Sequence, residues 1–181
     1  MDKILTSWAS LAWSLGTLAA AIVAGLIVHR IFFAVLSRIA NRTSSTIDNS
    51  FVAHSRKPAA LLLPLIGVIL VMPLLHLQPQ IHDTVNHMLG LAIIASIAWL
   101  SIAMTSVLSD VMATRYNVNV KDNLAARRVL TQVNVLRRIL VVIIVIISAS
   151  VMLMTFPGVR QFGQTLFASA GVAGLVLPFL E

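Results

Sequence analysis

Long apolar stretches separated by shorter polar segments dominate the pattern of this chain. Five stretches contain no Asp, Glu, Lys or Arg, and each is close to the ~20 residues that a helix needs to cross a bilayer. We therefore predict an all-α, polytopic transmembrane protein with about five spans. They lie at about 4–28, 58–79, 84–109, 139–159 and 161–180. Pro64 and Pro73 predict a break or bend in the second span.

The two long connections, 29–57 and 110–138, also have a helical period. In the first, an apolar stripe predicts a helix along the membrane surface, with Arg30, Arg38 and Arg42 able to reach lipid headgroups. The stripe consists of Ile31, Phe32, Val35, Leu36 and Ile39. In the second, Asn123 is a plausible N-cap, and the apolar period after it predicts that the fourth helix begins before the membrane. Residues 41–50 and 116–123 are the expected polar breaks.

Composition and charge support the membrane assignment and give an orientation. The chain is 59% hydrophobic and 10% charged, which excludes an ordinary soluble domain. Of its 13 Lys and Arg residues, all but Lys3 and Arg160 lie in the two long connections. The positive-inside rule then predicts an outside N-terminus and a cytoplasmic C-terminus. A secretory signal is the alternative for the first stretch, although that stretch is longer than a typical signal core.

The polar residues form no catalytic constellation, so we expect neither an enzyme nor a bound cofactor or metal. His76, His82 and His87 can gather near the outer face, but their spacing matches no ligand motif, and interfacial histidines are the alternative. Asp110 either pairs with Arg137 or Arg138 or is a solvated helix terminus. The paired arginines either contact anionic lipid headgroups or only mark topology. These pairs are Arg127 with Arg128 and Arg137 with Arg138. No basic domain outside the membrane is present for nucleic-acid binding.

Small residues crowd the last apolar stretch. They are Ala168, Ala170, Gly171, Ala173 and Gly174. In lipid, small residues let helices approach closely, and Ala170 with Gly174 forms a small-xxx-small pair. Two interpretations remain open, namely packing within one chain and packing around a central pore.

Residues 125–177 resemble the MscS family of mechanosensitive channels. The resemblance is carried by Leu136-Arg137-Arg138-Ile139-Leu140, the apolar fourth span, Phe156-Pro157-Gly158-Val159 and the small residues from Ala168 to Leu177. It divides the chain into a variable membrane region, 1–124, and an MscS-like region, 125–181. It implies that Ala168, Ala170, Gly171, Ala173 and Gly174 pack the last, Ala/Gly-rich pore-type helices of neighbouring subunits together.

The resemblance also implies an activity and its setting. Leu175 and Phe179, four residues apart, would form an apolar constriction that gates by dewetting. The expected molecule is a homo-heptamer in the bacterial inner (cytoplasmic) membrane. It would contact lipids and release ions and small osmolytes under tension. Pro178 stands where the family usually has Gly, and no vestibule region follows, so we expect a truncated or altered-terminus membrane part. The alternatives are a non-conducting scaffold or partner-binding subunit and, third, a secondary transporter.

Overall fold

Helices make up nearly all of the described structure. The computed structural model describes residues 2–43, 45–75, 78–115 and 124–176 of the 181-residue chain, and no strand occurs in these ranges. The α-helices are α1 (Asp2–Thr43), α2 (Thr46–Val71), α3 (Pro79–Arg115), α4 (Leu124–Met154) and α5 (Arg160–Val176). Two short 3₁₀ turns, η1 (Met72–Leu74) and η2 (Pro157–Val159), follow α2 and precede α5. The predicted all-α class is confirmed.

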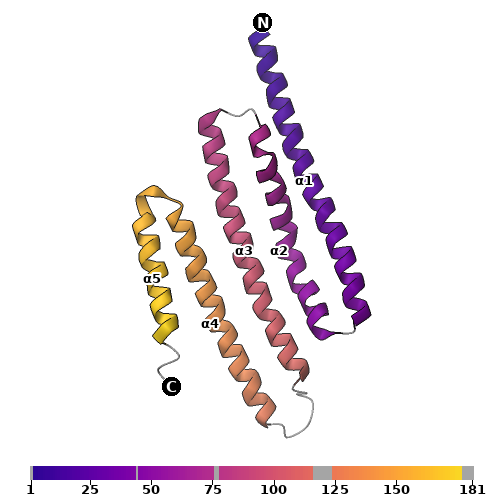
Figure 1. Cartoon of the computed structure of the whole chain (residues 1–181), viewed down its shortest axis with the longest axis vertical. Helices are drawn as coiled ribbons and strands as arrows, with labels where there is room; N and C mark the ends of the chain where they lie inside the picture. The colour runs from indigo at the N-terminus through magenta and orange to yellow at the C-terminus, as the bar shows by residue number, and fades with distance from the viewer. Residues whose placement is uncertain (1, 44, 76–77, 116–123, 177–181) are drawn as a thin grey trace.

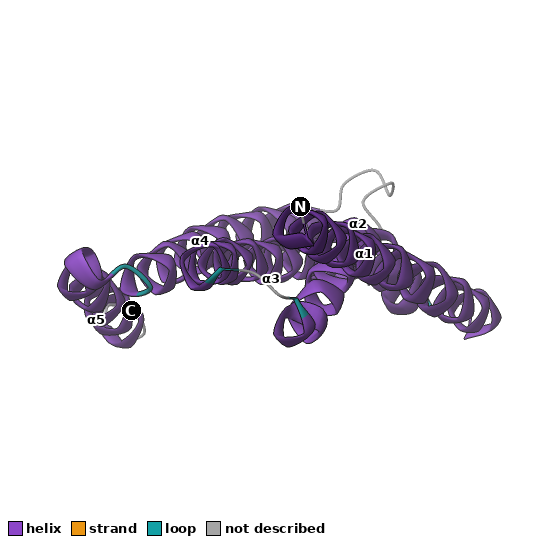
Figure 2. Ribbon diagram, turned by 90° about the horizontal axis from the view of Figure 1, so that it is seen from above, coloured by secondary structure: helices purple, strands orange, loops and turns teal. Residues whose placement is uncertain are grey.

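The five helices form a single antiparallel row. Each helix packs mainly against the next one in the chain, from α1 at one edge to α5 at the other (Figure 1). Seen from above, the row is essentially one helix thick and follows chain order (Figure 2). Because no second layer covers the row, every helix has an open face.

Within the described residues, four helices are long and apolar enough to cross a membrane. Their candidate spans are Ala12–Thr43, Thr46–Leu74, Pro79–Thr114 and Val129–Met154. The described part of α5 has 17 residues, about 25 Å at 1.5 Å per residue. A fifth span at 161–180 therefore stays a prediction, and residues 177–181 lie outside the described part of the chain.

α1 corrects the expectation of a separate surface helix. It is one uninterrupted helix of 42 residues, so Ile31, Phe32, Val35, Leu36 and Ile39 continue the first span. No Pro interrupts this stretch, and Gly25 is the last Gly in α1. Without a helix breaker between Val28 and Thr43, continuing the backbone hydrogen bonds costs less than breaking them. α1 extends to Thr43 and α2 begins at Thr46, so most of the polar break expected at 41–50 is helical.

The prolines of the second apolar stretch differ in effect. α2 begins at Thr46, well before the predicted start at 58, and runs through Pro58 and Pro64 without interruption. Pro73 instead lies in the 3₁₀ turn η1, where α2 ends. The predicted break is thus confirmed at Pro73. At Pro64 the helix continues, and this proline packs tightly against α1.

That tight packing joins α1 and α2 through small residues. A Cβ added to Gly25 would lie 2.5 Å from Pro64 Cα, and one added to Gly67 would lie 3.0 Å from the carbonyl oxygen of Ala21. Contacts this close are possible only without side-chain atoms between the backbones. Within the described residues few other apolar side chains are buried, whereas many large ones are exposed along the row. This distribution fits helices that face lipid.

Candidate functional site

The small residues of α5 face away from the rest of the chain wherever they are described. α5 follows η2 and runs back along α4, its one extensive contact within the described chain (Figure 1). Ala168, Ser169, Gly171 and Val172 are exposed, and a Cβ at Gly171 would have no neighbouring atom within 4 Å. Within the described residues, Gly171 does not pack against another helix of its own chain. This surface is open to another helix or to lipid.

The side chains of other residues predicted for the pore lie outside the described structure. The backbones of Ala170, Ala173, Gly174 and Leu175 belong to α5, but the side chains of Ala170, Ala173 and Leu175 lie outside the described residues. Phe179 and Pro178 lie outside them entirely. The pairing of Leu175 with Phe179 as a constriction thus stays a prediction.

The turn before α5 packs against the start of α3. The ring centroids of His87 and Phe156 are 4.7 Å apart, in an edge-on arrangement. His82 instead has its Nδ1 3.7 Å from Asp83 Oδ1, and His76 lies outside the described residues. Within the described ranges, His82 and His87 thus have different partners, and no group of three metal-ligating side chains occurs.

Asp110 corrects another prediction, because its partners are on α2 and not on α4. Ser50 Oγ donates a hydrogen bond to Asp110 Oδ2 at 3.0 Å. His54 Nδ1 lies 3.6 Å from the same oxygen and 2.9 Å from the Ser50 carbonyl oxygen, to which it can donate. Ser50 and His54 are one turn apart and so share a helix face. The row order explains the difference, since α3 meets α2 along one side and α4 along the other.

Arg137 forms its hydrogen bond with a different residue of α3. Its Nη2 donates to Ser106 Oγ at 2.8 Å, one turn before Asp110. Arg137 Nε and Ser109 Oγ are buried without a hydrogen-bond partner in the described structure. Arg138 is exposed, while the side chains of Arg127 and Arg128 lie outside the described residues. Headgroup contact by these arginines stays a prediction. Arg137 already donates a hydrogen bond to Ser106.

A third polar contact joins α1 to α2. His29 Nε2 lies 3.0 Å from the carbonyl oxygen of Arg56, to which its N–H tautomer donates, and its ring is 4.8 Å from the Phe33 ring. Together with the Asp110 and Arg137 contacts, this bond gives each consecutive pair of helices from α1 to α4 a side-chain hydrogen bond. All three bonds lie toward the same end of the helices. Sequence reasoning missed His29, Ser50, His54 and Ser106. The one available signal was a polar residue on an otherwise apolar helix face.

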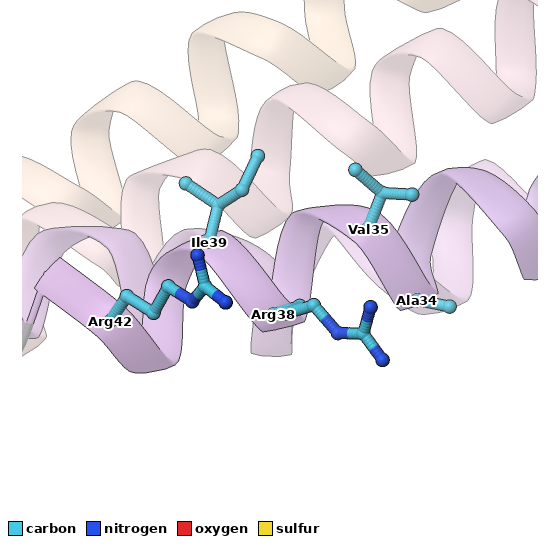
Figure 3. A pocket seen from close by; sticks show the side chains of 5 residues that line it. All are labelled: Ala34, Val35, Arg38, Ile39 and Arg42. Atoms are coloured by element: carbon cyan, nitrogen blue, oxygen red, sulfur yellow. The ribbon is translucent and has the colours of Figure 1, made fainter.

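A shallow hollow lies on the outward face of α1. Its lining residues are Ala34, Val35, Arg38, Ile39 and Arg42, and its volume is about 300 Å³ (Figure 3). Both guanidinium groups are on this side of the helix (Figure 3). Neither makes an ion pair within the described part of the chain. The face thus combines apolar surface with two positive charges.

Comparison with known proteins adds no family to this picture. No family model matches the chain, and no curated protein or solved structure is significantly similar to it.

Proposed function

We propose that this chain is the membrane part of a tension-gated channel of the MscS type, a non-enzymatic protein that releases ions and small osmolytes. One observation carries the proposal: the described part of the chain leaves the small-residue surface of α5 open. Gly171 has no neighbour within 4 Å at its Cβ position, and Ala168 and Val172 are exposed. A surface of this composition fits close packing against other helices.

Seven copies would place α5 around a central pore, with α1 to α4 extending outward into lipid. The single-row architecture supports this arrangement, since α5 is at an edge of the row. Leu175 and Phe179 would narrow the pore to an apolar constriction that excludes water. Membrane tension favours the state with the larger in-plane area, so stretching the bilayer would shift the population toward the open pore.

Patch-clamp recording tests this function directly. The full chain is reconstituted in liposomes and exposed to stepped suction, with empty liposomes as the control. We expect tension-graded unitary currents. Silence from correctly inserted protein would contradict the channel and favour the second candidate, a non-conducting membrane scaffold whose α5 surface packs against another protein.

The gate is tested by Leu175→Ser. A hydroxyl in the constriction lowers the cost of wetting it, so the channel should open at lower tension. Phe162→Ser is the control on the same helix, because Phe162 is 70% exposed and lies away from the predicted constriction. A threshold that does not change for Leu175→Ser in a conducting protein would contradict the gate assignment.

A further inference from the structure

The outward face of α1 carries an apolar ridge that ends in two arginines. The ridge consists of Ile27, Ile31, Val35 and Ile39, which are spaced four residues apart and are each 51–60% exposed. Residues four apart lie on one side of a helix. Arg38 and Arg42 adjoin the last turns of the ridge and line the same hollow as Val35 and Ile39 (Figure 3).

Within the described residues, no carboxylate forms an ion pair with Arg38 or Arg42. Asp48, in the first turn of α2, accepts a hydrogen bond from Thr43 Oγ1 at 2.6 Å. Within the described residues it forms no ion pair with Arg42. Like charges one helical turn apart repel each other. An anion between the guanidinium groups would replace this repulsion by two attractive contacts.

We propose that this face of α1 binds one anionic phospholipid, with the phosphate between Arg38 and Arg42 and an acyl chain along Val35 and Ile31 toward Ile27. Guanidinium groups bind phosphate oxygens with paired, charge-assisted hydrogen bonds. Ile27 and Arg38 are eleven positions apart, which corresponds to a rise of about 16 Å along the helix. That length equals about half of the ~30 Å hydrocarbon thickness, so the ridge matches one leaflet.

The continuity of the ridge favours a lipid over an acidic protein partner. The ridge begins inside the candidate span Ala12–Thr43 and reaches Arg38 without a break in the helix. A water-soluble partner that covered Arg38 and Arg42 would leave Ile27 and Ile31 to lipid in any case. Arg30, two turns before Arg38, is exposed. Its long side chain can extend along the helix toward the same phosphate layer.

Binding is measured on the full chain in neutral detergent, by native mass spectrometry with titrated dioleoyl phosphatidylglycerol and with dioleoyl phosphatidylcholine for comparison. We expect one phosphatidylglycerol to bind preferentially. Since each basic residue near a membrane surface contributes ~1 kcal/mol, Arg38→Ala with Arg42→Ala should weaken binding about 10- to 30-fold. Arg38→Lys with Arg42→Lys should retain part of the affinity, because the charge remains while the paired hydrogen bonds are lost.

The matched control is Arg56→Ala with Lys57→Ala, which removes the same charge from two exposed residues of α2. An equal loss of lipid in this control would mean non-selective attraction and would overturn the proposal. So would displacement of the lipid by inorganic phosphate or glycerophosphoglycerol at equal concentration, which would indicate a site for soluble anions. A changed oligomeric state of the Arg38/Arg42 variant with unchanged lipid binding would assign the face to a second copy instead.

Discussion

At Gly25, a single missing side chain determines how closely two helices approach. The Cβ of an alanine would meet Pro64 Cα at 2.5 Å, and backbone atoms of a packed helix cannot move aside easily. We expect Gly25→Ala to lower the free energy of unfolding by about 1–3 kcal/mol. The measurement is denaturant unfolding in detergent micelles.

Gly16 supplies the control for this prediction. It lies on the same helix, but an added Cβ there has no neighbour within 4 Å. Gly16→Ala should be neutral or should stabilise the helix by up to ~1 kcal/mol, because alanine has the higher helix propensity. Equal losses of unfolding free energy at both positions would show that the destabilisation at Gly25 does not come from the α1–α2 contact.

Asp110 is one of the residues whose polar contacts join two helices. His54 and Asp110 side chains are 35% and 43% exposed, so solvent screens their attraction. A double-mutant cycle between His54→Ala and Asp110→Ala should give a coupling energy of about 0.5–1 kcal/mol. His82 and Asp83 form the control pair, since they are neighbours in the chain and join no two helices. Coupling no larger than in that pair would contradict a joining role for Asp110.

Among the elements, α1 departs most from the sequence expectation. The periodicity of its second half predicts a helix along the membrane surface. Periodicity, however, shows only which face of a helix is apolar and does not show how that helix is oriented. The structure makes the same residues part of one 42-residue helix. Helix content, the apolar faces and the start of α4 just after Asn123 were predictable, because they depend on local pattern. The ends of α1 and α2 were not.

The continuity of α1 can be measured with spin labels. The chain has no cysteine, so single labels can be introduced at Ile22 and Asn41, which are both exposed. Nineteen residues in one straight helix separate their Cα atoms by about 28 Å. Pulsed electron–electron double resonance should give a single narrow distance distribution near this value. A shorter, broad distribution would indicate a hinge between the span and a surface helix.

For the whole molecule, the open face of α5 is the feature with the largest consequence. If copies of the chain pack through this face, Gly171→Val should reduce the oligomer population severalfold and leave the helix content unchanged, because a bulky side chain separates the helices. Gly90→Val is the matched control, as Gly90 on α3 also has nothing within 4 Å of an added Cβ. Chemical crosslinking in liposomes measures the oligomer. Equal effects of the two variants would exclude α5 as the specific interface.

Local chain chemistry is sufficient to predict the all-α membrane class of this protein and the character of its surfaces. Apolar stretches, charge placement and small residues follow from local chain chemistry, and they identified membrane helices and the special composition of α5. Only the tertiary structure decided which polar groups meet. Asp110 lies against Ser50 and His54 because packing in a row places α2 beside α3, a relation between residues sixty positions apart that no local pattern encodes. The same packing leaves Gly171 and the Arg38–Arg42 face without a neighbour among the described residues of their own chain.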